Sequence, residues 1–561
     1  MNLCSIRIQA ASRFLRALLS VVSLTAKKSI SMKRSSQIAL ASILAIATPL
    51  FAEIQLAPVF SHNMILQREI TIPLRGMADE EKQVSVSFND NEYTGQVTDG
   101  RWQVELPAMP AGGSFEITVT GASNTLTLSN VTFGDIWLCA GQSNMDSAIK
   151  TYKDKFPELY KGHPVKQHGQ IRIFRAARLP IDEPQEFITR EHRFDKGWYP
   201  IEPRTRTRLF SATGYFFGLY LAEEVDVPIG LIQSCRGGTP ITAWMPPGSL
   251  EEREEYAPIL QDYQQAVLDW PVNKIDYDKT VQEWEAKKAS GAKVGWKPEP
   301  PQGPESNKRP YALHNGMIAP LYQLPIKGAL WYQGEGNSKT REDSVQYEIL
   351  LKDLVAYWRS NWGNPSMPVL VVQLPGFGNA TKQPSTNNNW PWIRESQKNI
   401  EDIENCKAVC ILDSGMQKDI HPPYKENVGK RLAYAARNMV YGQANAPQSP
   451  EYRTHTCEGE STLITFDHIG SGLTTGKALL ENTVYNADDV LGFIVMDARG
   501  SYQRARGKIV APNQVRVNHP GISSPKSIRY GWENFPDVNL FGESEMPAFP
   551  FRTDTFSAFK K

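Results

Sequence analysis

The chain has almost no net charge and few long apolar runs. Its 561 residues include 61 Lys and Arg against 60 Asp and Glu, which leaves a net charge of +1. Because nucleic acids and anionic membrane surfaces attract basic proteins, this balance indicates neither as a partner. The clearest apolar run, residues 38–51, is too short for a comfortable membrane span. We therefore expect no nucleic-acid partner and no stable membrane span in the mature chain.

Cysteine and histidine are also scarce. Of six cysteines, Cys4 lies near the N-terminus and the other five have no regular spacing, which is not the pattern of a disulfide framework. The sequence does not decide whether Cys406 and Cys410 form a disulfide bond. The nine histidines show no zinc-ligand spacing, so we expect no metal site.

The N-terminus contains the pattern of an export signal. Met32, Lys33 and Arg34 form a basic start, residues 38–51 are mostly apolar, and Ala52 is a small residue where a signal peptidase can cut. We predict that residues 1–52 are a leader, with Met32 as an alternative start, and that the mature chain begins near Glu53. The protein is then expected to be exported, either to the periplasm or out of the cell.

Two segments have the alternating apolar and polar pattern of β-strands. This pattern, with turn-forming residues at short intervals, predicts an N-terminal β domain at residues 53–130, resembling an antiparallel sandwich. It returns at residues 446–561, which we predict to be a C-terminal β domain and tail. The clearest runs are residues 83–88, 102–106, 461–466 and 514–517.

Between these segments, residues 131–445 alternate buried strands with helices. The predicted strands are residues 135–140, 171–175, 228–233, 327–332, 368–373 and 407–413. The predicted helices are residues 213–225, 344–362, 391–403 and 425–441. This alternation predicts an α/β fold with a parallel sheet that is covered by helices on both faces. An insertion at about 246–310 interrupts it, with helical pieces expected near 250–268 and 276–289.

The first candidate catalytic residue follows a short apolar run. Residues 136–140 are nearly all apolar and bounded by glycines, which is typical of a buried strand, and Ser143 comes just after that strand. Open α/β sheets place their ligand sites at this end of their strands. Ser143 is therefore a candidate nucleophile, and the alternative is a turn serine that caps the next helix.

A serine nucleophile needs a base, a group that orients the base, and donors for the oxyanion. Asp419 and His421 also follow a predicted strand, so His421 is a candidate general base and Asp419 its orienting partner. The alternative is a surface Asp and His in a Pro-rich turn. Donors are expected where two other strands end, from the glycines after residues 228–233 and from the amide of Asn337, although both stretches also fit simple turns.

Taken in order, these blocks resemble those of the sialate O-acetylesterase family of carbohydrate esterases, within the SGNH (GDSL-like) hydrolase superfamily. The matching blocks are residues 141–145, Gly238 or its neighbour Gly237, residues 334–337 and residues 419–422. With flanking stretches, the resemblance extends from about residue 54 to about residue 554.

The resemblance implies a three-layer α/β/α hydrolase domain of the SGNH type, flanked by the two β segments. It implies removal of O-acetyl groups from a sugar or glycan through an acyl-enzyme on Ser143, without metal or cofactor. The oxyanion hole would consist of the backbone N–H groups of Ser143 and Gly238 and the side chain of Asn337. A sialate substrate and an acetylated polysaccharide such as xylan both remain open, because sugar contacts lie on variable loops.

Four polar residues near these blocks are candidate substrate contacts: Gln142, Arg236, Gln333 and Glu335. Arg236 is suited to bind a sialate carboxylate with two parallel hydrogen bonds, and the alternative is a solvated loop arginine. For the other three, two roles are open: contact with the sugar, or bracing of the loops through hydrogen bonds. His314 is expected to be structural, and Trp244 and Trp331 line the pocket or belong to the core.

Two other kinds of protein fit parts of the pattern. A non-catalytic carbohydrate-binding module would explain the β segments and the aromatic residues, but the ordered blocks argue against it. A glycoside hydrolase would need a carboxylate pair such as Glu335 and Asp413 at a suitable separation, which the sequence does not indicate.

Overall fold

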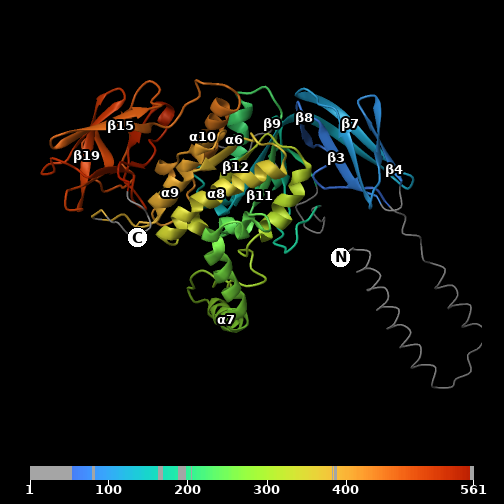
Figure 1. Cartoon of the computed structure of the whole chain (residues 1–561), viewed down its shortest axis with the longest axis horizontal. Helices are drawn as coiled ribbons and strands as arrows, with labels where there is room; N and C mark the ends of the chain where they lie inside the picture. The colour runs from blue at the N-terminus through green and yellow to red at the C-terminus, as the bar shows by residue number, and fades with distance from the viewer. Residues whose placement is uncertain are drawn as a thin grey trace, which may run out of the picture. The chain divides into compact units, whose positions relative to one another are not determined.

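The computed structural model describes residues 53–78, 82–161, 168–186, 197–203, 205–381, 383–384 and 388–555 (Figure 1). The predicted leader, residues 1–52, lies outside the described residues. No helix in the described ranges combines the length and the apolar character that crossing a membrane requires.

The strand β8, Thr125–Gly141, joins two parts of the fold. Its first half pairs antiparallel with β7, Gly112–Thr120, and its second half lies parallel between β11, Ile229–Cys235, and β12, Gly328–Tyr332. Residues 131–141 are all buried, as the apolar run predicts for a central strand. The predicted boundary at residue 130 thus falls inside one continuous strand, and the β8 backbone connects the N-terminal segment directly to the central sheet.

The central sheet is largely parallel, as predicted. The order is β10-β9-β11-β8-β12-β13-β14, and every neighbouring pair is parallel except β10 with β9. The strands not yet given are β9, His168–Arg175, β10, Tyr199–Ile201, β13, Val369–Val372, and β14, Cys406–Val409. The mixed α/β fold with a parallel sheet is confirmed, and all six predicted strands lie in this sheet.

The longer helices of this region pack in two pairs. Helices α6, Ala212–Ala222, and α10, Lys425–Met439, approach closely because Gly429 of α10 has no side chain; a Cβ there would lie 2.5 Å from Cβ of Phe216. Helices α8, Arg341–Asn361, and α9, Trp390–Lys398, form the second pair (Figure 1). Shorter helices are α3, Ser143–Asp146, α4, Ile149–Lys155, and α5, Thr205–Arg208.

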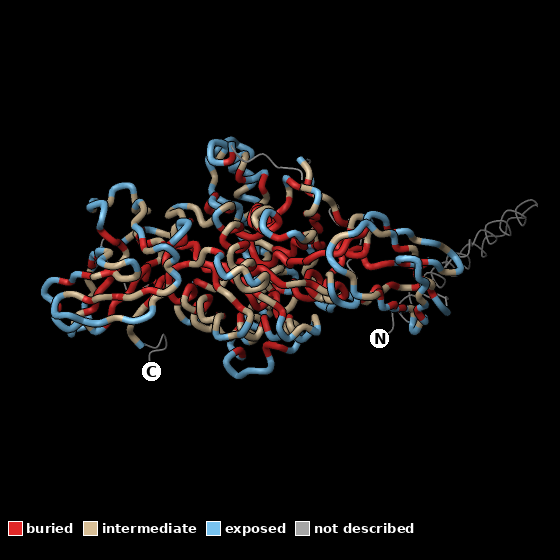
Figure 2. The backbone as a smooth tube through the Cα atoms, turned by 90° about the horizontal axis from the view of Figure 1, so that it is seen from above, coloured by how far each residue is buried: buried red, intermediate tan, exposed pale blue. Residues whose placement is uncertain are grey.

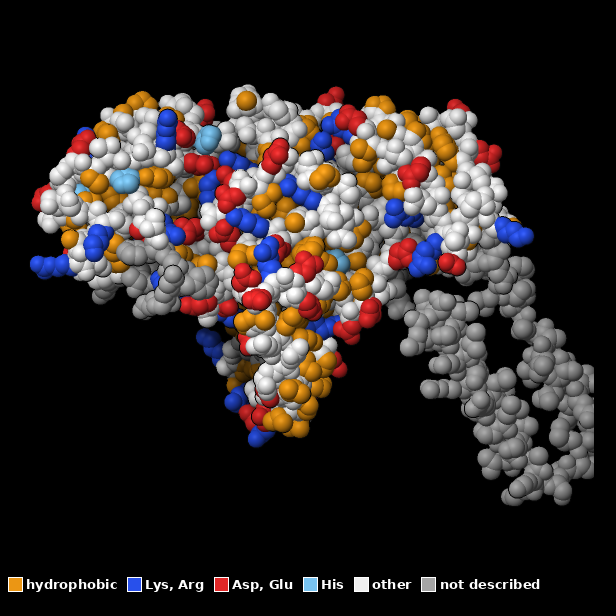
Figure 3. Space-filling view, in the orientation of Figure 1, with side chains coloured by type: hydrophobic (Ala, Val, Ile, Leu, Met, Phe, Trp, Pro, Cys, Tyr) orange, Lys and Arg blue, Asp and Glu red, His pale blue; other side chains and the backbone are white. Residues whose placement is uncertain are grey.

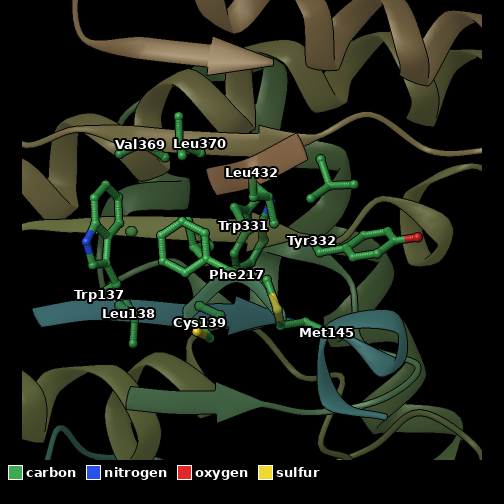
Figure 4. Close-up of a cluster of buried hydrophobic side chains, with 14 of the residues drawn as sticks. Trp137, Leu138, Cys139, Met145, Phe217, Trp331, Tyr332, Val369, Leu370 and Leu432 are labelled. Atoms are coloured by element: carbon green, nitrogen blue, oxygen red, sulfur yellow. The ribbon is translucent and has the colours of Figure 1, made fainter. Parts of the chain in front are cut away.

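The side chains between sheet and helices are apolar and buried (Figure 4). Figure 2 shows that the buried residues gather in the interior of the backbone trace. Trp137 of β8 meets Phe217 of α6 edge to face, with ring centroids 5.3 Å apart. Trp331 of β12 is fully buried and its ring contacts Trp244, so both tryptophans belong to the core and neither lines a pocket. Cys406 and Cys410 are both free thiols in this structure.

The insertion contains one long helix, α7, Ala257–Ala289, where two pieces were expected. Pro271 lies inside it, and a proline removes one backbone hydrogen bond at a cost of about 3 kcal/mol. With 33 residues the helix tolerates this loss and continues. Figure 3 shows apolar side chains on this helix, and Leu268, Val272 and Ile275 are exposed.

The N-terminal segment is built from two antiparallel sheets. One contains β1, β3 and β6; the other contains β4, β5, β7 and the first half of β8, with the short β2 parallel to β8. Buried and exposed residues alternate along β4 and β6, as the sequence predicts. The bounds are Gln55–Leu56, Ile65–Gln67, Ile72–Met77, Gln83–Phe88, Asn91–Gln96 and Arg101–Leu106 for β1 to β6.

The C-terminal segment forms an antiparallel sheet in the order β15-β16-β20-β19-β18-β21-β23. Its strands are Glu451–Glu458, Ser461–Asp467, Gln514–Asn518, Tyr502–Ala511, Asp489–Met496, Ser527–Tyr530 and Phe551–Arg552, and Thr474–Thr475 (β17) pairs with Leu540–Phe541 (β22). Two α9 side chains attach this segment to the hydrolase region: Arg394 donates to the Gly531 carbonyl at 3.0 Å, and Glu395 pairs with Arg552 at 2.7 Å.

Candidate active site

Ser143 and His421 lie within hydrogen-bonding distance of each other. Ser143 begins helix α3 directly after β8, and His421 lies in the loop between β14 and α10. The distance from Ser143 Oγ to His421 Nε2 is 2.8 Å. Two residues 278 positions apart thus meet at the edge where the parallel strands end, as the sheet topology predicts.

Asp419 contacts the backbone and the ring of His421. One carboxylate oxygen accepts a hydrogen bond from the His421 backbone N–H at 2.9 Å and lies 3.8 Å from Nδ1. The other oxygen pairs with Lys155 of α4. Burial raises the pKa of Asp419, but the contacts with Lys155 and with the His421 N–H outweigh it, so the pKa is lowered overall. Asp419 is therefore ionised at neutral pH.

The imidazole of His421 is held in its neutral form at neutral pH. Burial is the largest influence and lowers its pKa, and the ammonium groups of Lys425 and Lys155 act in the same direction. The charge of Asp419 opposes them without reversing the result. A neutral imidazole whose Nε2 faces a hydroxyl is able to accept the hydroxyl proton.

Of the two neighbouring glycines, Gly237 lies against Ser143. A Cβ at Gly237 would be 3.3 Å from Ser143 Cβ, whereas a Cβ at Gly238 would meet nothing within 4 Å. Gly238 has a left-handed backbone, with φ of +71°, which favours glycine at this turn. The close approach of Ser143 therefore favours glycine at position 237.

The Asn337 side chain is fixed through its oxygen. Oδ1 accepts hydrogen bonds from the backbone N–H of Ile241 and from Nε2 of Gln333, both at 2.9 Å. Nδ2 is thereby turned away from these donors, and it has no hydrogen-bond partner among the described residues. This leaves the amide donor available for a ligand.

Gln142 and Gln333 are buried and their side chains connect the site loops. Oε1 of Gln142 accepts from Gln333 Nε2 at 3.2 Å and from the Gly336 N–H at 3.1 Å. Gln333 also donates to the Thr239 carbonyl at 3.1 Å. These hydrogen bonds indicate that both glutamines brace the site loops, the alternative to contacting the sugar.

The carboxylate of Glu335 faces the interior. Oε1 accepts from Asn144 Nδ2 at 2.5 Å, Oε2 is buried, and burial raises the pKa of the group. The proposed partner of a glycosidase pair, Asp413, is engaged by both terminal nitrogens of Arg431, at 2.6 and 2.8 Å. Neither carboxylate is arranged to act on a sugar, which argues against the glycoside hydrolase alternative.

Arg236 lies beside Gly237 with a second arginine nearby. Arg178 pairs with Asp146, which also accepts from Gln233 Nε2 at 2.9 Å. The Arg236 guanidinium has no hydrogen bond or ion pair with any other described side chain, and burial, followed by the charge of Arg178, lowers its pKa. Asp146 is thus paired with Arg178 and acts on Arg236 only through its charge, which leaves the Arg236 guanidinium without a carboxylate bound to it among the described residues.

His314 does not join this site. Its ring contacts Asn315 Oδ1 at 3.2 Å and the Tyr322 hydroxyl at 3.1 Å, and burial lowers its pKa to about 4. Both ring nitrogens are engaged inside the protein, which fits the expected structural role. No group of three or more His, Cys, Asp or Glu side chains suited to a metal occurs in the part of the chain that the structure describes.

Three functional candidates were missed from the sequence: Asn144, Lys155 and Lys425. Asn144 stands next to the nucleophile, and its amide contacts both Glu335 and the Ile420 carbonyl. Lys425 is fully buried, although it begins a helix. For Asn144 and Lys425 the only sequence signal was their nearness to Ser143 and His421.

A comparison with known protein families shows which family the chain belongs to. The sequence profile of the family described as "Carbohydrate esterase, sialic acid-specific acetylesterase" matches residues 133–276 and 291–438, more than half of the chain. The chain belongs to this family. The predicted resemblance to the sialate O-acetylesterases is thereby confirmed, and the part of α7 between the two stretches lies outside the match.

Curated relatives of this chain carry the name sialate O-acetylesterase. The protein from Rattus norvegicus is 29% identical over 371 residues, which cover 61% of this chain and 64% of the relative. The protein from Homo sapiens is 27% identical over 420 residues, which cover 69% of this chain and 71% of the relative. The chain therefore spans about two thirds of the length of these relatives.

A solved structure is similar over most of the chain. It is a carbohydrate acetylesterase from Xanthomonas citri, 28% identical, with a TM-score of 0.72. The alignment covers 90% of this chain and 100% of the other. The likeness therefore includes both β segments as well as the central sheet.

Proposed function

We propose that this member of the carbohydrate esterase family is a serine esterase that removes O-acetyl groups from carbohydrate, and that its substrate is an acetylated sialate. The observation that carries the proposal is the 2.8 Å contact between Ser143 Oγ and His421 Nε2, made by a histidine held neutral at neutral pH. We also assign the hydrolase region to the three-layer SGNH type, with the α6–α10 and α8–α9 pairs on opposite faces of the sheet.

The first half of the reaction transfers the acetyl group to the enzyme. The Ser143 hydroxyl attacks the acetyl carbonyl while His421 Nε2 takes its proton. The bond between the carbonyl carbon and the sugar oxygen then breaks, and His421 returns the proton to that oxygen. The ionised Asp419 stabilises the imidazolium that exists between these steps.

The second half releases acetate. His421 takes a proton from water, and the resulting hydroxide attacks the acetyl ester on Ser143. The ester bond breaks, Ser143 Oγ recovers the proton from His421, and acetate leaves. In both halves the negative oxygen is stabilised by the backbone N–H of Ser143, the N–H of Gly238 or its neighbour Gly237, and Nδ2 of Asn337.

Acetate release from two substrates tests the proposal. An O-acetylated sialic acid and an acetylated xylan are offered at equal acetyl concentration to the purified chain. Release from the sialate at a higher kcat/KM supports the proposed substrate. A preference for xylan would make the chain a polysaccharide esterase of the same fold, and no release from either by the folded protein would favour the carbohydrate-binding module.

Arg236 is proposed to bind the carboxylate of the sialate, because it is partly buried and directly precedes Gly237, which lies against Ser143. Arg236→Gln is expected to lower the ratio of kcat/KM for the free acid to that for its neutral methyl ester by about tenfold, the value of roughly 1.5 kcal/mol for a charged hydrogen bond. Measuring this ratio makes the result independent of the amount of active protein. An unchanged ratio would show that Arg236 does not contact the carboxylate.

We further propose that residues 1–52 are removed during export. Sequencing the N-terminus of the protein recovered outside the cytoplasm is expected to find a start near Glu53. Recovery of the uncleaved chain from the cytoplasm alone would contradict export.

A further inference from the structure

A buried hydrogen-bonded chain of three side chains lies beneath Ser143. Lys425 Nζ donates to Oδ1 of Asn144 at 2.5 Å, and Nδ2 of Asn144 donates to Glu335 Oε1, also at 2.5 Å. Lys425 is 0% exposed and Asn144 1% exposed. The three come from α10, from the nucleophile turn and from the loop after β12, so the chain joins three segments that carry the site.

Asn144 connects the nucleophile directly to the base. It follows Ser143 in the chain, and its Nδ2 also donates to the Ile420 carbonyl at 2.9 Å. Ile420 stands between Asp419 and His421. All three hydrogen bonds of this amide therefore act on the relative position of Ser143 and His421, or on the groups that hold it.

Lys425 has few partners for a buried ammonium group. Its one hydrogen bond from Nζ in the described region goes to Asn144, and its Nζ lies 5.1 Å from the ring centre of Tyr332 and 5.5 Å from that of Tyr152. Burial lowers its pKa to about 7, while the charges of Glu335 and Asp419 oppose this change. Removing such a group changes both the hydrogen bonding and the charge of the site.

The two charges at the ends polarise the amide in the same sense. The ammonium of Lys425 attracts electron density toward Oδ1, and the carboxylate of Glu335 attracts the N–H hydrogens. Because the ammonium withdraws density from Nδ2, it strengthens both hydrogen bonds that Nδ2 donates, to Glu335 and to the Ile420 carbonyl. The three hydrogen-bonded side chains thus hold the His421 loop more firmly than an isolated asparagine would.

We propose that Lys425 is a positioning residue of this site: through Asn144 it fixes the His421 loop relative to Ser143, and its positive charge disfavours the imidazolium form of His421. The inference rests on the proposed esterase function. Lys425 does not act on substrate itself, because its ammonium group is buried beneath the nucleophile turn.

The expected pH dependence of kcat/KM follows from the charged groups that face His421. They are Lys425 of α10, Lys155 of α4 and Asp419 of its own loop. The lysine charges disfavour the imidazolium and Asp419 favours it. Below about pH 7 Lys425 is protonated, so its charge is present where His421 titrates. Removing that charge raises the pKa of His421, and the acid limb of the kcat/KM profile then moves to higher pH.

Two substitutions separate the two effects. Lys425→Met removes the charge and the hydrogen bond, and we expect kcat at the optimum to fall about 10- to 100-fold, as for a displaced catalytic group, with the acid limb at higher pH. Lys425→Gln removes the charge but keeps an amide donor toward Asn144. It is expected to shift the acid limb in the same direction with a smaller loss of kcat.

Lys430→Met is the matched control, because Lys430 lies on the same helix and contacts only the rings of Tyr220 and Tyr434 among described aromatic residues. Its pH profile is expected to equal that of the wild type, and thermal unfolding checks that each variant is folded. An acid limb that stays in place in folded Lys425→Gln, with an active wild type, overturns the inference alone. A wild type that releases no acetate overturns the proposed function and the inference with it.

Discussion

Replacing His421 by alanine is expected to lower kcat for acetate release by about four to six orders of magnitude, because Ser143, the proposed nucleophile, loses its proposed base, which lies 2.8 Å from Oγ. KM is expected to change much less, since the imidazole acts mainly in the transition state. Acetate release measured at saturating substrate checks both values. The residual rate comes from binding and from the oxyanion donors, which this substitution leaves in place.

His62→Ala is a suitable control for the loss of a histidine. His62 is exposed on the N-terminal segment, where its ring contacts Ser129 at 3.0 Å, and this variant is expected to retain full activity. If His421→Ala kept more than about a hundredth of the wild-type kcat, His421 would not be the general base.

Asn337→Ala is expected to reduce kcat by about 10²- to 10³-fold, the usual effect of losing one oxyanion donor. The substitution removes Nδ2 from the site, takes away the side-chain acceptor of the Ile241 N–H, and leaves Gln333 Nε2 with its other acceptors, Gln142 Oε1 and the Thr239 carbonyl. The comparison of kcat with KM distinguishes the two effects: loss of a transition-state donor lowers kcat, whereas a disordered loop would also raise KM.

The control removes an asparagine amide of the same kind from the surface. Asn361 lies at the end of α8, is exposed, and donates to the Tyr357 carbonyl within its own helix. Asn361→Ala is expected to leave kcat unchanged. A loss of less than about fivefold in folded Asn337→Ala would contradict its assignment to the oxyanion hole.

The central sheet was predictable because its strands are short buried runs separated by helical segments. Periodicity identifies such strands, but it does not show where a strand begins when the preceding residues already alternate. The first half of β8 pairs with β7 and looks like part of a separate β domain. Only the register of the whole strand shows that the same backbone continues into the central sheet.

The meeting of Ser143 and His421 was predictable because parallel strands bring their ends to one edge. The orientation of the supporting side chains was not, since it depends on packing between distant segments. Glu335 shows this most clearly: its sequence position favoured a substrate contact as much as a bracing role, yet its carboxylate faces Asn144 in the interior. Likewise, a lysine at the start of a helix is usually exposed, and Lys425 is buried because the α4 and β12 tyrosines cover it.

The most direct test of the central claim is to label the purified protein with a serine-directed phosphonate and to locate the adduct by peptide mass spectrometry. Wild type and Ser143→Ala are treated in parallel, and acetate release is followed as the label is incorporated. We predict one phosphonyl group per chain on Ser143, loss of acetate release in proportion to labelling, and neither labelling nor release in Ser143→Ala. Full acetate release by the labelled wild type, or by Ser143→Ala, would contradict the assignment of Ser143 as the nucleophile.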